Sequence, residues 1–243
     1  MLGLFSSFDK GKVKSQLKVS VQRISLLKNK KGQLIERAKK ELAVLLQNSK
    51  IEQARVKVEH LIREHGLVDG LEMLGCLCDL LLARFSLIES EKRLPPELKE
   101  IVCTLLWAAP RTEVEELKSI RQDLLAKYGS AVGTEADKSG EAVAAEIVRR
   151  CASPEAAAEA GGVDAAVPGA CVRTPVVKAL AYRIPTEAEL CEQLNALAAE
   201  FRIDGWETLV PPAPPSHPPI LPPPTVPGSN GVGEPAEVAQ ARA

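Results

Sequence analysis

The chain has 243 residues, enough for one sizeable helical core with a tail or for two small domains. Aromatic residues make up only 3% of it, so any core must be built from aliphatic residues, which suit helix packing better than a β-sandwich. The net charge of −1 hides an asymmetry: residues 10–40 carry 11 basic groups and one acid, whereas residues 66–243 carry 16 basic and 26 acidic groups. Such asymmetry suggests a membrane or nucleic-acid partner.

The apolar segments do not indicate export or membrane insertion. Residues 1–5 show neither a basic n-region nor a long apolar run, so we expect no secretory signal. The most apolar window, 71–88, is interrupted by three charged residues, which argues against a spanning helix. The six cysteines are scattered, and we expect them to stay reduced in a cytoplasmic protein.

Two long helices are expected in the first part of the chain. Residues 10–48 place apolar side chains, Leu34 among them, at every third or fourth position, which makes one stripe along an α-helix. Asp9 is the expected N-cap of this helix, and Asn48-Ser49 offers a tight break after it. A second stripe predicts a helix over 50–93, which Pro95-Pro96 stops. The glycines at 66, 70 and 75 suggest a point of flexing within it. At about 1.5 Å per residue each helix is roughly 60 Å long, and the short break between them favours an antiparallel hairpin.

Shorter elements follow the hairpin. Helices are expected near 97–107 and 113–128, and a later one over 186–203 begins with the capping-box residues Thr186 and Glu189. Between them, residues 129–171 are expected to form a loosely ordered insertion. Residues 141–151 of that insertion look helical, but residues 152–171 are rich in Ala and Gly and show no clear apolar stripe.

The end of the chain differs from the rest in composition. Residues 207–243 contain 11 of the 18 prolines and no aromatic residue, so they cannot bury enough surface to fold. We expect a disordered, partly polyproline tail there. The predicted fold is therefore all-α: one domain over residues 1–206, built on a long antiparallel hairpin with shorter packing helices, followed by this tail.

The sequence shows no pattern typical of an enzyme or a metal site. It contains no glycine-rich phosphate loop, no His-Glu-x-x-His and no Cys-x-x-Cys. Cys76 and Cys78 lie two residues apart and His60 and His65 five apart, spacings that point side chains to different faces of a helix. We therefore predict neither catalysis nor a metal or cofactor.

The strongest functional signal is the basic run of the first helix. Each Lys or Arg near an anionic leaflet contributes about 1 kcal/mol, so half of the run would give useful but salt-sensitive membrane binding. The alternative is an ordinary solvated face. Nucleic acid would use the same charges, but no aromatic platform accompanies them, so we rank it lower. The predicted membrane-binding residues are Lys10, Lys12, Lys14, Lys18, Arg23, Lys28, Lys30, Lys31, Lys39 and Lys40.

Two apolar or proline-rich segments are further binding candidates. Leu2, Leu4, Phe5 and Phe8 precede the basic run and either dip into a bilayer or pack on the hairpin as a hydrophobic staple. The prolines from 211 to 227 suit peptide recognition, because a preformed polyproline segment loses little entropy on docking, or they serve as a spacer.

Three stretches resemble the increased-sodium-tolerance family of ESCRT-III-like proteins. The most specific is Ala-Arg-Val-Lys-Val-Glu-His-Leu-Ile-Arg-Glu at 54–64, which leads to Cys-Asp-Leu-Leu-Leu-Ala-Arg-Phe at 78–85. The second is Leu-Trp-Ala-Ala-Pro-Arg at 106–111, and a looser likeness covers 172–207. The resemblance implies a five-helix ESCRT-III fold in which the last helix folds back onto the hairpin.

The resemblance also implies a role in multivesicular-body sorting, at the surface of endosomal membranes. Partners would be charged multivesicular body (ESCRT-III) subunits, further copies of the chain, and the AAA ATPase that disassembles the polymers, bound through its MIT domain. The usual leucine-spaced docking helix is missing from the tail, so its place would be taken by an extended ligand formed by Ile220, Leu221, Pro222 and Val226. The alternatives are a nucleic-acid-binding hairpin and a coiled-coil scaffold without a membrane role.

Overall fold

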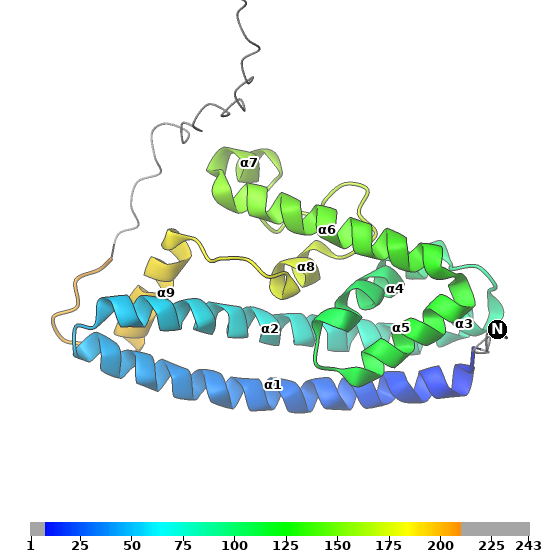
Figure 1. The fold of residues 1–243 in the computed structure, drawn as a ribbon, viewed down its shortest axis with the longest axis horizontal. Coiled ribbons are helices and arrows are strands. Elements are labelled where there is room, and N and C mark those ends of the chain that lie inside the picture. The colour runs from blue at the N-terminus through cyan, green and yellow to red at the C-terminus, as the bar shows by residue number, and fades with distance from the viewer. Residues whose placement is uncertain (1–7, 210–243) are drawn as a thin grey trace, which may run out of the picture. The chain divides into compact units, whose positions relative to one another are not determined.

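Two long antiparallel helices form the frame of the domain (Figure 1). In the computed structural model, which describes residues 8–209, α1 spans Lys10–Gln47 and α2 spans Ile51–Ala83. The Asp9 carboxylate accepts the backbone N–H groups of Gly11 and Lys12 at 2.9 and 3.0 Å, as predicted for the N-cap of α1. Ser49 adopts a positive φ of 56° and reverses the chain between the helices.

Gly66 and Gly70 of α2 make room for another helix, and none of the three glycines interrupts α2. Helix α2 runs through all of them, and α8 (Thr174–Leu180) packs against it at this place. A Cβ on Gly70 would lie 2.6 Å from Cδ2 of Leu180, and one on Gly66 would lie 3.3 Å from the carbonyl oxygen of Ala179. The predicted helix over 50–93 instead breaks at Arg84, after which the short α3 spans Phe85–Ser90.

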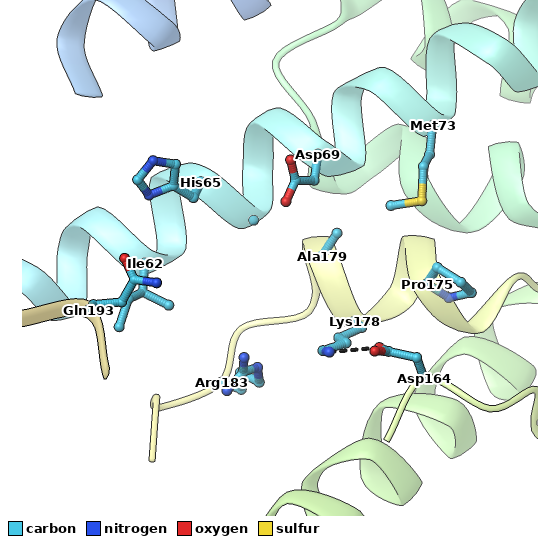
Figure 2. A pocket seen from close by; sticks show the side chains of 11 residues that line it. Ile62, His65, Asp69, Met73, Asp164, Pro175, Lys178, Ala179, Arg183 and Gln193 are labelled. Carbon is cyan, nitrogen blue, oxygen red and sulfur yellow. Dashed lines mark ion pairs between the residues drawn. The ribbon is translucent and has the colours of Figure 1, made fainter. Parts of the chain in front are cut away.

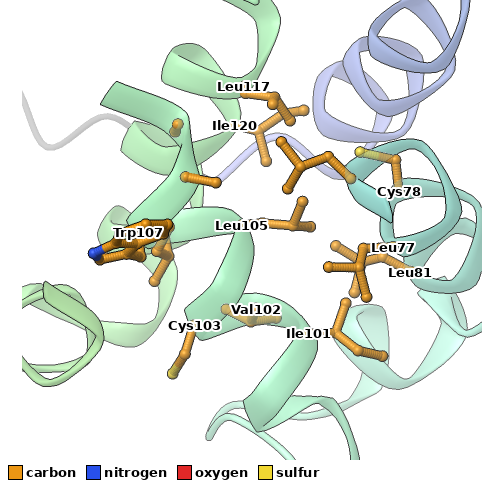
Figure 3. Packing of buried hydrophobic residues seen from close by; sticks show 14 of the residues in the cluster. Leu77, Cys78, Leu81, Ile101, Val102, Cys103, Leu105, Trp107, Leu117 and Ile120 are labelled. Carbon is orange, nitrogen blue, oxygen red and sulfur yellow. The ribbon is translucent and has the colours of Figure 1, made fainter. Parts of the chain in front are cut away.

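The short helices after Pro95-Pro96 build the main core. Helix α4 (Pro96–Ala108) is buried along most of its length and continues into the 3₁₀ turn Ala109–Arg111. Helix α5 (Glu115–Tyr128) packs beside it and against α1. Figure 3 shows leucines of α2 meeting Ile101, Leu105 and Ile120 in this cluster. The predicted helices 97–107 and 113–128 are both present.

Within the insertion expected over 129–171, residues 141–151 are helical as predicted, but the expectation of loose order is wrong for 130–140. Residues 130–152 form α6 (Ser130–Ala152), followed by the short α7 (Pro154–Glu159). The buried stripe of α6 begins with small residues spaced three and four apart, so it does not look like an apolar stripe: Gly133, Ala136, Gly140, Val143 and Ile147. Small side chains allow α6 to pack directly on α4.

One buried arginine orders the loop behind α7. The side chain of Arg150 is only 3% exposed, and its guanidinium donates to Glu146 and to the carbonyl oxygen of Ala165, at 2.8 and 2.6 Å. A buried charge is tolerated only when it is paired and hydrogen-bonded in this way. This connection therefore folds over α6 instead of remaining loose.

Helix α9 crosses the closed end of the hairpin and completes the domain. It spans Glu187–Glu200 and contributes to a second apolar cluster with α1 and α2, separate from the main core. The predicted capping box is present, because Thr186 Oγ1 accepts the N–H of Glu189 at 3.3 Å and the Glu189 carboxylate accepts that of Thr186 at 2.8 Å. No β-strand occurs among residues 8–209, and most of the predicted tail lies outside them.

Candidate functional site

The basic residues of α1 divide into two groups. The first group is bound to acids of the same domain and fastens α1 to its neighbours. Its ion pairs are Lys12–Asp123 at 3.0 Å, Arg23–Glu116 at 2.7 Å, Lys28–Glu72 at 2.9 Å, Lys31–Glu64 at 3.0 Å and Lys39–Glu200 at 3.4 Å. These five were predicted to bind membrane, but their charges are largely neutralised where they lie.

The second group is exposed and has no ion pair within the described residues: Lys10, Lys14, Lys18, Lys30, Arg37 and Lys40. At about 3.6 residues per turn, Lys18, Lys30, Arg37 and Lys40 lie on the side of α1 opposite its buried residues. Lys14 instead lies 5.7 Å from the centre of the Phe85 ring. Four cations of the predicted run, Arg37 included, therefore point outward from the hairpin.

Exposed aliphatic side chains accompany these cations. Val19, Leu26 and Val44 are 43, 70 and 54% exposed, and Leu34, which was expected in the buried stripe, is 45% exposed. We call these residues together the outer face of α1: Lys18, Val19, Leu26, Lys30, Leu34, Arg37, Lys40 and Val44. Aliphatic residues among cations are typical of a helix that lies in a membrane interface. These exposed aliphatic residues could have been found in the sequence, because Val19 and Leu26 do not belong to the predicted buried stripe.

Acidic groups are few along the outer face. Glu36 and Glu41 flank it, and Lys57 of α2 binds Glu41 at 2.9 Å. That hydrogen bond and charge lower the pKa of the Glu41 carboxyl below its ordinary value. The face therefore keeps a positive charge.

A groove lies where α8 crosses α2 (Figure 2). It has a volume of about 520 Å³, and a second hollow of about 290 Å³ shares part of its wall. Ile62 and Met73 of α2 and Ala179 of α8 supply apolar wall. The Lys178 ammonium is bound to Asp164 at 2.6 Å and the Arg183 guanidinium to Glu189 at 2.7 Å, so these cations are not free to bind an anion. Sequence reasoning missed this groove.

The Glu189 carboxylate links the groove to the start of α9. Burial alone would raise the pKa of Glu189, but hydrogen bonds from Arg183 and Thr186 outweigh it and hold the pKa below its ordinary value of 4.5. The stability that Glu189 contributes is therefore complete above this value and is lost as the pH falls below it.

Replacing this carboxylate is expected to weaken α9 in a pH-dependent way. Glu189→Gln should lower the free energy of unfolding by about 1 kcal/mol at neutral pH, because the charged cap and its arginine partner are lost together. The difference from the unmodified chain should shrink in acid, where Glu189 itself becomes protonated. Thermal denaturation at neutral pH and at acid pH checks this prediction. Glu192→Gln, on the exposed side of α9, is the control. Equal losses at both pH values would contradict it.

The other predicted binding residues lie at or beyond the limits of the structure. Phe8 is half-buried against the main core, and the Lys127 ammonium lies 4.5 Å from the centre of its ring. This packing on the hairpin is the arrangement expected of the staple alternative for Phe8. Leu2, Leu4 and Phe5, and the tail residues Ile220, Leu221, Pro222 and Val226, lie outside the described residues.

The described part of the chain offers no metal-binding cluster. Within residues 8–209, no three His, Cys, Asp or Glu side chains converge in a way that would hold a metal ion. Cys76 is exposed whereas Cys78 is buried, and burial raises the pKa of the Cys78 thiol to about 12. No helix among these residues is both long and apolar enough to cross a bilayer.

The described residues form a helical scaffold, in which a long hairpin with a basic and aliphatic outer face is closed by a crossing helix. Residues 14–161 match the Ist1 family, described as "Regulator of Vps4 activity in the MVB pathway". The chain therefore belongs to the Ist1 family. This confirms the resemblance that the sequence showed to the increased-sodium-tolerance proteins.

Known proteins agree with this assignment. An IST1-like protein of Dictyostelium discoideum is 31% identical over 214 residues, 88% of this chain and 50% of that protein. The vacuolar protein sorting-associated protein IST1 of Saccharomyces cerevisiae is 32% identical over 124 residues, 47% of this chain and 41% of that protein. The chain thus matches half or less of the length of these relatives.

A solved structure has the same fold. The crystal structure of the S. cerevisiae Ist1 N-terminal domain, in complex with the Did2 MIM motif, aligns with a TM-score of 0.60 at 20% sequence identity. The alignment covers 80% of this chain and 93% of that one. It confirms the predicted all-α, ESCRT-III-like hairpin architecture.

Proposed function

We propose that this chain is a peripheral regulator of ESCRT-III assemblies on endosomal membranes, and that it docks on acidic lipid through the outer face of α1. The observation that carries the proposal is the joint placement of unpaired cations and exposed aliphatic residues on that face. Lys18, Lys30, Arg37 and Lys40 together would contribute about 4 kcal/mol near an anionic leaflet. Leu26 and its aliphatic neighbours would add hydrophobic area that salt does not screen.

Co-sedimentation of the full chain with vesicles tests this function. We expect binding to phosphatidylcholine vesicles that contain phosphatidylserine, weaker binding as salt rises, and little binding to phosphatidylcholine alone. Nucleic-acid binding with a steep salt slope and no vesicle binding would favour the nucleic-acid alternative. Capture of sister subunits by a chain that ignores vesicles would favour a coiled-coil scaffold.

The groove between α2 and α8 is the place that we propose for a sister ESCRT-III subunit. The yeast Ist1 domain was crystallised with a MIM motif of Did2, which supports a partner of this kind. A volume of about 520 Å³ with apolar wall residues accepts several side chains of an amphipathic helix. Self-assembly of the chain would use other surfaces and is a separate proposal.

A charge placed in the groove is expected to remove this binding. Met73→Glu should weaken binding of a fluorescent MIM-type peptide to the full chain by at least about tenfold, because the carboxylate would lose water against an apolar helix face. Fluorescence anisotropy gives the affinity. Cys76→Glu is the matched control, since Cys76 is exposed on the same helix and outside the groove. Equal weakening by both variants, or by neither, would rule out the groove.

Control of the AAA ATPase is the last part of the proposal. The family description supports it, and the extended segment with Ile220, Leu221, Pro222 and Val226 is our proposed ligand for the MIT domain. Titration of the full chain against an isolated MIT domain tests the segment. Ile220→Asp with Leu221→Asp should abolish binding if the segment is the ligand. Unchanged affinity would exclude it.

A further inference from the structure

Two of the six cysteines meet where α4, α6 and the segment that leads into α8 come together. All six are free thiols in the structure. Cys103 lies on α4 and is fully buried, and Figure 3 shows it on the side of α4 turned away from Leu77 and Leu81 of α2. Cys171 lies just before α8, belongs to the same core and is 8% exposed.

Hydrogen bonds fix the segment around Cys171 against both helices. The N–H of Cys171 donates to Ser139 Oγ of α6 at 2.9 Å. Two residues further on, the N–H of Arg173 donates at 3.0 Å to Oγ1 of Thr104, which is the neighbour of Cys103 in α4. The segment therefore bridges α4 and α6 beside Cys103.

The two thiols interact directly at this junction. Burial, and then the charge and the hydrogen bond of the Cys171 thiol, raise the pKa of the Cys103 thiol to about 12. Cys103 is therefore protonated at neutral pH and is not the thiol that an oxidant attacks first. A disulfide forms only between cysteines that can approach to bonding distance, and these two are already in contact.

Cys171 is the member of the pair that solvent can reach. A hollow of about 320 Å³, lined by Glu135, Ser139 and Ala170 among others, opens beside it, and its thiol donates to the carbonyl oxygen of Glu135 at 3.8 Å. The Lys99 ammonium is bound to the Glu135 carboxylate at 2.7 Å, and it lies near enough to interact with the charge of either thiol. A cation favours the thiolate, which is the form that reacts with oxidants.

We propose that Cys103 and Cys171 form a peroxide-sensitive pair whose oxidation ties the start of α8 to α4. The Cys171 thiolate attacks one oxygen of hydrogen peroxide, the O–O bond breaks, and a sulfenic acid and one water result. The Cys103 thiol then attacks that sulfur, so the S–S bond forms and the S–O bond breaks. The displaced hydroxide leaves with the Cys103 proton as a second water. Each sulfur loses one electron in total, and the peroxide gains the two.

The disulfide would act on the part of the chain between the two cysteines. It would close a loop of about 70 residues that contains α5, α6 and α7, and closing a long loop restricts the unfolded chain strongly. It would also tie the beginning of α8, which forms one wall of the α2 groove, to the main core. The inference does not depend on the membrane proposal or on a partner in the groove.

Treatment of the full chain with hydrogen peroxide tests the pair. We expect mass spectrometry of the chain, digested without reductant, to find a peptide that contains Cys103 joined to one that contains Cys171. The melting temperature should rise by at least about 4 °C and return when dithiothreitol is added. Cys103→Ala and Cys171→Ala should each lose both effects. Cys191→Ala is the matched control and should keep both, because Cys191 is also buried but lies on α9.

Four results would overturn the inference. Oxidation of Cys171 to a sulfinic acid while Cys103 stays a free thiol would show that the two sulfurs cannot join. A disulfide that links two chains, or one that forms only in urea, would show that the folded chain does not hold the pair ready. An unchanged melting temperature in the fully cross-linked chain would refute the stabilising effect. If an alanine variant fails to fold, the disulfide mapped in the unmodified chain decides.

Discussion

Removing the four outward cations of α1 is expected to lower the affinity for phosphatidylserine vesicles by about a thousandfold. The variant combines Lys18→Gln, Lys30→Gln, Arg37→Gln and Lys40→Gln. Each charge near the lipid contributes about 1 kcal/mol, and about 1.4 kcal/mol corresponds to a tenfold change in affinity. Fold stability should hardly change, because these side chains are exposed and unpaired among the described residues. Co-sedimentation at physiological salt gives the affinity.

The paired cations of the same helix supply a control with an equal change in charge. Lys12→Gln, Arg23→Gln, Lys28→Gln and Lys39→Gln together remove four positive charges whose ammonium or guanidinium groups lie on acids of the domain. Vesicle affinity should fall less than tenfold, because each of these groups is already bound to a carboxylate of the domain and adds little free positive charge. Equal losses in the two variants would mean that net charge alone drives binding.

The hairpin followed from the sequence because its signal is local. A stripe of period near 3.6 and the N-cap Asp9 predicted a helix over 10–48, and α1 ends one residue earlier, at Gln47. The chain break at Asn48-Ser49 and the capping box of α9 are equally local signals. Such features need only a few neighbouring residues to be recognised.

Helix α6 was predicted only over 141–151, because the buried side of its first half is made of small residues. Hydrophobic patterning detects large aliphatic side chains, whereas Gly133, Ala136 and Gly140 are buried because other side chains approach the backbone closely. The packing of α8 on α2 was missed for the same reason, because Gly66 and Gly70 allow α8 to approach the α2 backbone closely. Glycine inside a helix signals close packing as well as flexibility, and only the tertiary structure distinguishes the two.

The sequence shows which residues of α1 are cationic, but it does not show which of them are free of ion pairs. Which lysines remain free depends on acids far away in the chain; Lys39 and Glu200, for example, are 161 residues apart. Counting charges along 10–40 therefore overestimates how many cations are free of ion pairs among the described residues. The groove could not be predicted at all, because it exists only where α8 lies across α2.

A methyl group at Gly140 is expected to destabilise the fold more than any surface change considered above. The added Cβ would overlap the indole ring of Trp107, which is 1% exposed and packed on all sides. Overpacking of this kind costs about 1–3 kcal/mol, and Gly140→Ala belongs at the upper end, since neither the ring nor α6 has space to move. Since alanine gains about 1 kcal/mol in helix propensity, the net cost is about 2 kcal/mol, and the melting temperature should fall by about 4–8 °C.

Gly32→Ala is the matched control for this prediction. Gly32 also lies inside a long helix, but a Cβ built there meets no atom within 4 Å. Alanine has the higher helix propensity, so this variant should gain about 1 kcal/mol and melt about 2–4 °C higher. The same substitution is made in both helices, so the gain in helix propensity is shared. Opposite changes in melting temperature would therefore reveal the packing cost at Gly140. If both variants melt higher, α6 is not packed against Trp107 as described.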